Sequence, residues 1–215
     1  MGLSMTEDTS FNQQKYESKN PFKQLALDRF YEALLSMPFE AETVLDAGCG
    51  EGFGASRLLD KLPGMTIYGI DLSYQALLNA QQISGKMDTL QSDVTRLPFE
   101  PDHFDLVLSL EVLEHLPDPA KAIQAYKRVS NRYLLLSVPN EPIFRTLRML
   151  EGNDILKWGD HPEHIQHWNF ITFPRFLKKQ GMRIISRKVP FPYTWVIVLC
   201  ELGQQDAAAA SGPKI

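Results

Sequence analysis

Segments rich in β-forming residues alternate with segments of helical periodicity through most of this chain. Two β-rich segments, FDLVLSL (104–110) and RYLLLSVP (132–139), are almost continuously apolar, which is typical of central strands buried on both faces. Others, such as TVLDA (43–47) and TIYGID (66–71), end in a small or an acidic residue. This alternation predicts an α/β fold with a Rossmann-like, doubly wound, mostly parallel sheet that helices cover on both faces.

Further strands and helices complete a sheet of seven strands. The other strands are DTLQSD (88–93), MRIISRKV (182–189) and TWVIVLCEL (194–202), and the helices cover about 21–37, 54–61, 73–83, 118–129 and 173–180. The first helix begins at Pro21, a frequent first helical residue, and carries Phe22, Leu25 and Phe30 at helical spacing. Only PFPY separates the last two strands, so they should form an antiparallel hairpin at one edge, and the last strand should be antiparallel.

Composition restricts the class of protein. With 215 residues, 44% of them hydrophobic, the chain is expected to form one domain with disordered tails at 1–14 and 204–215. Lys and Arg number 22 against 26 Asp and Glu, a net charge of −4, which disfavours nucleic acid as a partner. No apolar run reaches the roughly 18 residues of a membrane span, and two cysteines far apart fit a reducing compartment. We therefore expect a cytoplasmic protein without stable membrane insertion.

The first expected strand leads into VLDAGCGEGFGA (44–55), where glycine takes every second position from Gly48 to Gly54. These glycines are expected to adopt positive φ and to let backbone N–H groups approach a ligand closely. In a doubly wound sheet, ligands bind beyond the carboxyl ends of the strands. Asp71 ends the second strand, 21 residues after Gly50, where a carboxylate commonly contacts ribose hydroxyls. These features predict a ligand that contains an adenosine.

Two classes of cofactor remain open at this point. Gly50, Gly52 and Ala55 satisfy the dinucleotide fingerprint G-x-G-x-x-A, which would indicate an NAD-dependent oxidoreductase. That fingerprint should begin at the strand end, whereas Asp46 and Gly48 come first here. The sequence contains no accompanying Tyr–Lys or His motif for hydride transfer, so the oxidoreductase interpretation is the weaker one.

The stretch VLDAGCGEG resembles instead the first motif of class I S-adenosylmethionine-dependent methyltransferases, an acidic residue followed by G-x-G-x-G. GIDLS is similar to the second motif, and SDVTRLPFEPDHFDLVLSLEVLEHLPDP to the third and fourth, in the same order. The resemblance covers about Tyr16 to Val138 and is closest to the ubiquinone- and menaquinone-biosynthesis-like group of small-molecule methyltransferases. It implies the class I methyltransferase fold, S-adenosyl-L-methionine as cofactor and S-adenosyl-L-homocysteine as product.

The resemblance also assigns roles to residues around the turn. The glycine turn would hold the methionine part of the cofactor, Asp71 the ribose and Asp93 the adenine amino group, while an N-terminal segment, KYESKNP (15–21), would cover the cofactor. The expected cofactor-binding residues are Tyr16, Asp46, Gly48, Cys49, Gly50, Asp71, Leu72, Asp93, Val94, Ser109, Leu110 and Glu111.

Structural roles remain open for several of these residues. Asp46 could hold N–H groups of the loop, Asp71 could cap the helix that begins near Ser73, and Asp93 could fix a turn through its own side chain. Cys49 is expected to be a small packing residue and no nucleophile, and Tyr16 could anchor the first helix.

Histidines supply the candidates for catalysis. Methyl transfer from a sulfonium needs an acceptor in line and, for some acceptors, a base. His115 follows the fourth strand in LEVLEHL, and HPEHIQHWN (161–169) adds His161, His164 and His167. We expect His115, His164 and His167 to be catalytic, because imidazole accepts a proton near neutral pH, although a surface or loop-fixing role would also fit. No metal is expected, because zinc would need ligands beyond this histidine segment and the aspartates of metal-dependent catechol-type enzymes are missing.

The connection from Asn140 to Asn169 is long for such a sheet and is expected to be a lid over the acceptor. Its first part, EPIFRTLRML, has apolar residues on one face, and Trp158 and Trp168 flank the histidines. The expected function is methylation of a small-molecule acceptor, with oxygen slightly preferred over carbon or nitrogen as the methylated atom. A hydrophobic acceptor is one option. A non-catalytic cofactor-binding protein and an RNA methyltransferase also remain open, while the acceptor and the oligomeric state do not follow from the sequence.

Overall fold

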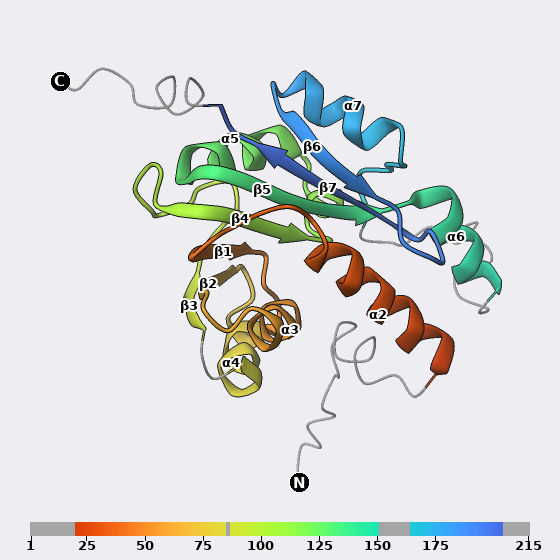
Figure 1. The fold of residues 1–215 in the computed structure, drawn as a ribbon, viewed down its shortest axis with the longest axis horizontal. Coiled ribbons are helices and arrows are strands. Elements are labelled where there is room, and N and C mark those ends of the chain that lie inside the picture. Colours follow the sequence, from red (N-terminus) through yellow and green to blue (C-terminus); the bar gives the residue numbers. More distant parts are fainter. Residues whose placement is uncertain (1–19, 85–86, 151–163, 204–215) are drawn as a thin grey trace, which may run out of the picture.

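The computed structural model describes residues 20–84, 87–150 and 164–203. Its strands form one seven-stranded sheet in the order β3-β2-β1-β4-β5-β7-β6 (Figure 1). The strands are β1 (Thr43–Ala47), β2 (Thr66–Asp71), β3 (Asp88–Gln91), β4 (Phe104–Leu110), β5 (Ser130–Pro139), β6 (Arg183–Lys188) and β7 (Trp195–Glu201). The predicted α/β fold with a mostly parallel sheet is confirmed.

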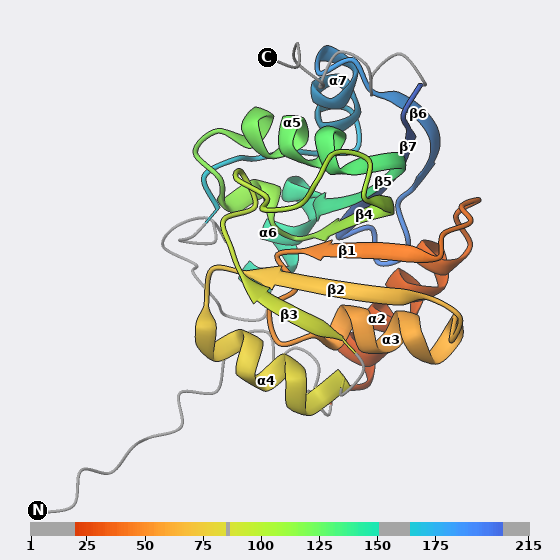
Figure 2. The same ribbon diagram turned by 90° about the vertical axis from the view of Figure 1, so that its left-hand side faces the viewer.

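Helices cover both faces of the sheet, as Figures 1 and 2 show. The helices are α2 (Pro21–Leu35), α3 (Phe53–Lys61), α4 (Tyr74–Ser84), the short 3-10 helix η1 (Leu113–His115), α5 (Pro119–Val129), α6 (Glu141–Leu150) and α7 (Thr172–Lys179). Helices α2, α3 and α4 share one apolar cluster with the sheet, and α5 and α7 share the other. None of the helices in the described ranges is long and apolar enough to span a membrane.

Helix α2 begins where the sequence predicted, because the Asn20 side chain accepts a hydrogen bond from the Phe22 N–H at 2.9 Å. The buried stripe of the helix consists of Ala26, Leu27, Phe30, Tyr31 and Leu34. Phe22 and Leu25, which the spacing placed on the same face, are instead 42% and 44% exposed. They lie in the first turns of the helix, outside the apolar cluster that its remaining turns form with the sheet.

Strand β1 lies at the point where the winding reverses. It pairs in parallel with β2 on one side and with β4 on the other, so the connections leave it in opposite directions. Ligands of doubly wound sheets bind beyond the carboxyl ends of strands at such a point. The fold therefore places the glycine turn, which follows β1, in the position of a ligand site.

The last two strands form the predicted antiparallel hairpin. This hairpin lies at one edge of the sheet, as predicted, with β7 inserted between β5 and β6 and antiparallel to both. From Trp195 to Cys200, β7 is fully apolar and buried, whereas β6 is only half-buried and carries charged side chains. Burial on both faces explains why the more apolar strand takes the inner position.

Candidate active site

A cavity of about 360 Å³ lies beyond the carboxyl ends of β1, β2 and β4. Its wall consists of Phe30, Asp46, Gly48, Cys49, Gly50, Glu51, Phe53, Gly54, Asp71, Leu72, Val94, Leu110, Glu111, Val112, His115 and Leu116. A volume of several hundred Å³ suits a small-molecule ligand. Most of the residues predicted to bind a cofactor meet here.

The glycine turn has the backbone conformation that the sequence predicted, with one exception. Gly48, Gly50 and Gly52 have φ of 83°, 51° and 78°, but Gly54 lies inside α3 and does not have positive φ. A Cβ on Gly48 would lie 2.4 Å from Cγ2 of Val112, so no side chain fits there. The turn therefore brings bare backbone to the cavity wall.

Asp71 holds this turn in place. Its Oδ2 accepts a hydrogen bond from the Gly50 N–H at 2.9 Å, and its Oδ1 accepts one from the Ser73 N–H at 2.8 Å. Helix α4 is capped by Ser73, whose hydroxyl accepts a hydrogen bond from the Ala76 N–H. Asp71 thus joins the turn after β1 to the start of α4, and it lines the cavity at the same time.

Asp46 is buried in the cavity wall, with 3% of its surface exposed. Burial, and then the nearby charge of Asp71, raise its pKa to about 7. The N–H groups of Gly48 and Cys49 donate to the carbonyl oxygen of Ile70, so Asp46 does not hold these loop N–H groups.

Cys49 is a buried free cysteine in the same wall. Burial, and then the charges of Asp46 and Asp71, raise the pKa of its thiol. A thiol that stays protonated is a poor nucleophile, in agreement with the packing role expected for it.

Glu51 is a cavity residue that the sequence analysis missed. Its side chain is almost fully buried, and its Oε1 accepts a hydrogen bond from the Asn79 side chain of α4 at 3.3 Å. Its Oε2 is buried and accepts no hydrogen bond from the residues that the structure describes. Its position between Gly50 and Gly52 could have indicated that Glu51 lines the cavity, since both glycines belong to the turn at the ligand site.

The end of β4 divides its residues between two sides of the sheet. Leu110 lines the cavity, whereas Ser109 is fully buried on the other face, with its hydroxyl 3.1 Å from that of Tyr126. Ser109, which the resemblance assigned to cofactor binding, is therefore not among the residues that line the cavity, because successive strand residues point to opposite faces. Glu111 follows with a positive φ of 59° and also lines the cavity.

Asp93 has the turn-fixing role that the sequence left open. Its Oδ1 accepts hydrogen bonds from the backbone N–H and from the hydroxyl of Thr95, both at 2.8 Å. The hydrogen bond from the Thr95 N–H, and then that from its hydroxyl, lower the pKa of Asp93. Asp93 is not among the residues that line the cavity, but its neighbour Val94 is.

Three chain segments bring the histidines together beyond the sheet. His115 ends η1 and lines the cavity, and its ring centroid lies 5.1 Å from that of His164. The His164 Nδ1 lies 2.7 Å from Oε1 of Glu141, the first residue of α6, and both side chains are buried. His167 is more exposed, with its Nδ1 3.8 Å from the same oxygen. Glu141 was not predicted, because no local pattern indicates a contact across 23 residues.

Glu114, His115 and His164 could hold a metal ion, since one ligand atom of each lies within 4.8 Å of those of the other two. No metal was expected from the sequence, either at the histidine segment or through the aspartates of catechol-type enzymes. The group described here draws on two separated elements instead, as metal sites usually do.

The segment around His164 is fastened to η1. The N–H groups of Ile165 and Gln166 donate to the carbonyl oxygen of Glu114 at 2.8 and 2.9 Å, and the Gln166 side chain donates to that of Leu116. Trp168 is buried against Phe173 and Phe176 of α7 rather than lining the cavity. Tyr16, Trp158 and His161 lie outside the described residues, as do both expected tails.

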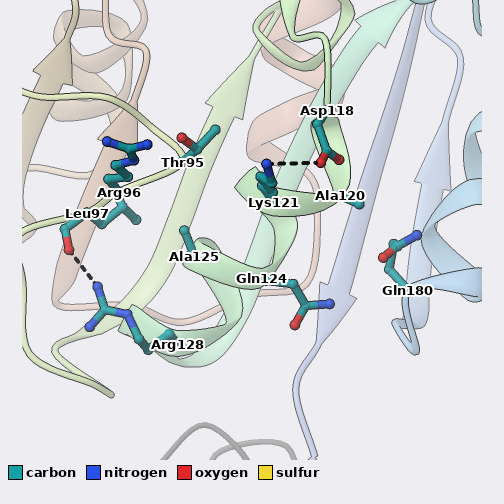
Figure 3. A pocket seen from close by; sticks show the side chains of 10 residues that line it. All are labelled: Thr95, Arg96, Leu97, Asp118, Ala120, Lys121, Gln124, Ala125, Arg128 and Gln180. Carbon is teal, nitrogen blue, oxygen red and sulfur yellow. Dashed lines mark hydrogen bonds and ion pairs between the residues drawn. The ribbon is translucent and has the colours of Figure 1, made fainter.

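A second, more open hollow of about 660 Å³ lies between α5 and the β3–β4 connection (Figure 3). Its charged residues are largely paired: Lys121 lies 3.6 Å from Asp118, and Arg128 donates to the carbonyl oxygens of Leu97 and Phe99. Among the described residues, its lining contains no glycine and comes from α5 with Asp118, the β3–β4 connection and Gln180. The smaller cavity is therefore the better candidate for the active site.

The strand order and the glycine turn after β1 agree with the fold that the resemblance to class I S-adenosylmethionine-dependent methyltransferases implied. Residues 45–132, about two fifths of the chain, match the family described as Methyltransferase domain, and the predicted resemblance is confirmed.

The ubiquinone biosynthesis O-methyltransferase of Paracidovorax citrulli (strain AAC00-1) is 37% identical over 98 residues, which are 43% of this chain and 40% of that protein. The chain thus matches about two fifths of the length of this curated relative.

Two solved structures have the same fold. Magnesium protoporphyrin IX methyltransferase from Synechocystis PCC 6803, with bound S-adenosylhomocysteine, superposes with a TM-score of 0.63 at 20% identity, over 90% of this chain and 88% of that one. The [4+2]-cyclase SpnF superposes with a TM-score of 0.66 at 16% identity, over 85% and 83%. At these identities the likeness concerns the fold, and the second protein is named for a different reaction.

Proposed function

We propose that this protein transfers a methyl group from S-adenosylmethionine to a small-molecule acceptor, with oxygen as the methylated atom. The observation that carries this proposal is the charge of the cavity, whose wall contains four carboxylates and neither Lys nor Arg among the described residues. The four are Asp46, Glu51, Asp71 and Glu111. S-adenosylmethionine carries a sulfonium and an ammonium group, which such a wall attracts, whereas the pyrophosphate of NAD would be repelled.

The strand order suggests how this chain would hold the cofactor. Asp71 at the end of β2 would accept hydrogen bonds from the ribose, with Leu72 and Val94 beside the adenine. The glycine turn after β1 would pass under the methionine part, with Asp46 and Glu111 near its ammonium group. When bound, the cofactor supplies a methyl group that is already activated by the positive sulfur. The protein then has only to orient the acceptor and exclude water.

His164 and Glu141 are the proposed proton-accepting pair. In this proposal Glu141 is ionised and accepts a hydrogen bond from the His164 Nδ1–H. The His164 Nε2 then takes the proton of an acceptor hydroxyl in the proposed reaction. His115, which lines the cavity beside His164, would contact the same acceptor. The relative's name, a ubiquinone biosynthesis O-methyltransferase, supports a hydroxyl acceptor.

The first experiment measures binding. Titration calorimetry should show binding of S-adenosylmethionine and S-adenosylhomocysteine and none of NAD, and Asp71→Ala should weaken the first two. Preferential binding of NAD would favour an oxidoreductase.

The second experiment measures transfer of a labelled methyl group to pools of phenols and other hydroxyl compounds. His164→Asn should lower kcat about a hundredfold or more and leave the KM for S-adenosylmethionine nearly unchanged. Glu141→Gln should have a smaller effect in the same direction. His103→Asn, at an exposed histidine in the connection just before β4, serves as the matched control. Tight cofactor binding without transfer to any pool would indicate a non-catalytic binding protein.

Metal dependence can be tested in the same assay. We expect chelation by EDTA to leave the rate unchanged, as the sequence analysis predicts. If activity is lost on chelation and restored by a divalent cation, the histidines are better explained as ligands together with Glu114.

A further inference from the structure

Glu111 has a backbone conformation that a residue with a Cβ rarely adopts. Its φ is 59°, in the left-handed region, and it directly follows the last residue of β4. Such outliers persist only where the surrounding structure determines them, and they are concentrated at functional sites. Glu111 also lines the cavity, so the question is which groups hold it there.

Hydrogen bonds with β5 and with β7 hold Glu111. Its N–H donates to the carbonyl oxygen of Ser137 in β5 at 3.2 Å. Its Oε2 accepts a hydrogen bond from the indole Nε1 of Trp195 at 2.7 Å, a short bond to a charged acceptor. The carboxylate is therefore oriented by a side chain that does not itself line the cavity.

Trp195 is buried between the sheet and α2. It is the first residue of β7, opposite Pro139 of β5, and only 7% of its surface is exposed. Its ring packs against Phe30 of α2 with centroids 5.1 Å apart, and Phe30 lines the cavity. The indole thus connects the inserted last strand with the cavity from outside its wall.

Resting on the function proposed above, we propose that Trp195 is a positioning residue for cofactor binding, which holds the Glu111 carboxylate toward the amino-acid half of the cofactor. The strand order β2-β1-β4 supports this direction. If Asp71 on β2 contacts the ribose, a ligand that crosses β1 brings its other end to β4, where Glu111 stands. The ammonium group at that end has the charge opposite to that of Glu111.

Calorimetry with two ligands tests the proposal. S-adenosylhomocysteine contains the amino-acid half, and 5′-methylthioadenosine lacks it. Trp195→Phe removes the N–H and keeps an aromatic ring, so it should raise the Kd of S-adenosylhomocysteine about threefold to tenfold and leave that of methylthioadenosine unchanged. Equal loss for both ligands, or no loss for either, would overturn the proposal, since a merely structural role does not distinguish them.

Two further variants isolate the contact. Trp168→Phe changes an equally buried indole on the opposite face of the sheet and should leave both dissociation constants unchanged. Glu111→Gln should weaken binding of S-adenosylhomocysteine, and adding Trp195→Phe to it should weaken binding little further, because the two residues act as one unit. Full additivity of the two losses would contradict the proposal.

A measurement on the unaltered protein covers the case in which Trp195→Phe does not fold. The NMR signal of the Trp195 indole N–H should shift on addition of S-adenosylhomocysteine and stay in place with methylthioadenosine. An unmoved signal with bound S-adenosylhomocysteine would overturn the role of Trp195 alone. Failure of the unaltered protein to bind S-adenosylhomocysteine would overturn the proposed function, and this inference with it.

Discussion

Two aspartates at opposite ends of neighbouring strands have carboxyl pKa values that are shifted in opposite directions. Asp46, near the carboxyl end of β1, is buried beside another carboxylate, and its pKa is raised to about 7. Asp105, near the amino end of β4, would also have its pKa raised by burial. Hydrogen bonds from the N–H groups of Thr43 and Glu42 and from the side chains of Asn131 and Thr43 lower it instead, to about 2. The charged form of Asp46 is thus disfavoured in the folded protein, whereas the charged form of Asp105 is stabilised by hydrogen bonds within it.

Asp46→Asn should make the protein more resistant to urea at pH 8 than at pH 5, relative to the unaltered chain. A pKa raised above its unfolded value means that the folded state loses stability as the pH rises from about 4 to about 7, where Asp46 becomes charged. Asparagine removes this loss, which amounts to roughly 4 kcal/mol over the whole interval. If the free energies of unfolding of Asp46→Asn and of the unaltered chain differ by the same amount at both pH values, the pKa of Asp46 is not raised.

Asp105→Asn should destabilise the protein at neutral pH by about 1–2 kcal/mol, because the amide cannot accept all the hydrogen bonds that the carboxylate accepts. The sign with pH is opposite to that of Asp46: a lowered pKa stabilises above about pH 4, and this contribution is lost as the pH falls toward 2. Urea unfolding at pH 7 and pH 3 measures the difference. The affinity for S-adenosylhomocysteine should not change, because Asp105 lies at the end of the sheet away from the cavity, and a changed affinity would show that the variant disturbs more than this end.

At the scale of the elements, the strands and helices were predictable and several contacts between them were not. The alternation of apolar β-rich runs with helical ones depends on local periodicity, and each of those segments is found close to its expected residues. The inner position of β7, the Trp195–Glu111 hydrogen bond and the His164–Glu141 pair join residues far apart in sequence. Local sequence patterns contain no information on such pairings. The sheet face to which the Ser109 side chain points is likewise set by the register of β4 in the sheet.

The glycine turn offers a test that compares two of its own positions. Gly48→Ala should destabilise the protein by about 1–3 kcal/mol and abolish most cofactor binding, because it combines positive φ with a Cβ placed 2.4 Å from Val112. Gly54→Ala is the matched control, since its Cβ would have contacts of 3.6 Å and longer in ordinary helical backbone. Thermal unfolding and calorimetry should therefore separate the two variants, and similar behaviour of both would mean that the turn is not built around a close approach.

At the scale of the whole molecule, the sheet separates a satisfied end from a site of concentrated negative charge. Four acidic side chains meet at one cavity, where proximity to Asp71 helps to raise the pKa of Asp46 to about 7, and a ligand with positive groups would relieve this repulsion. The fold alone does not specify methyl transfer, since a cyclase has the same architecture. The identity of the ligand bound at the carboxyl end of the sheet therefore distinguishes methyl transfer from other chemistry.

Binding to the folded state alone stabilises a protein by mass action, which gives a test of the whole molecule. At a concentration a hundred times its Kd, S-adenosylhomocysteine should contribute about 3 kcal/mol and raise Tm by roughly 5–10 °C for a chain of this size. Its single ammonium group is attracted by the acidic wall, whereas NAD at the same concentration should leave Tm unchanged because its pyrophosphate meets the same carboxylates. A shift with NAD and none with S-adenosylhomocysteine would refute the cofactor assignment.

S-adenosylmethionine, which adds the sulfonium charge, should bind more tightly than 5′-methylthioadenosine, because the latter lacks both positive groups that the carboxylates would attract.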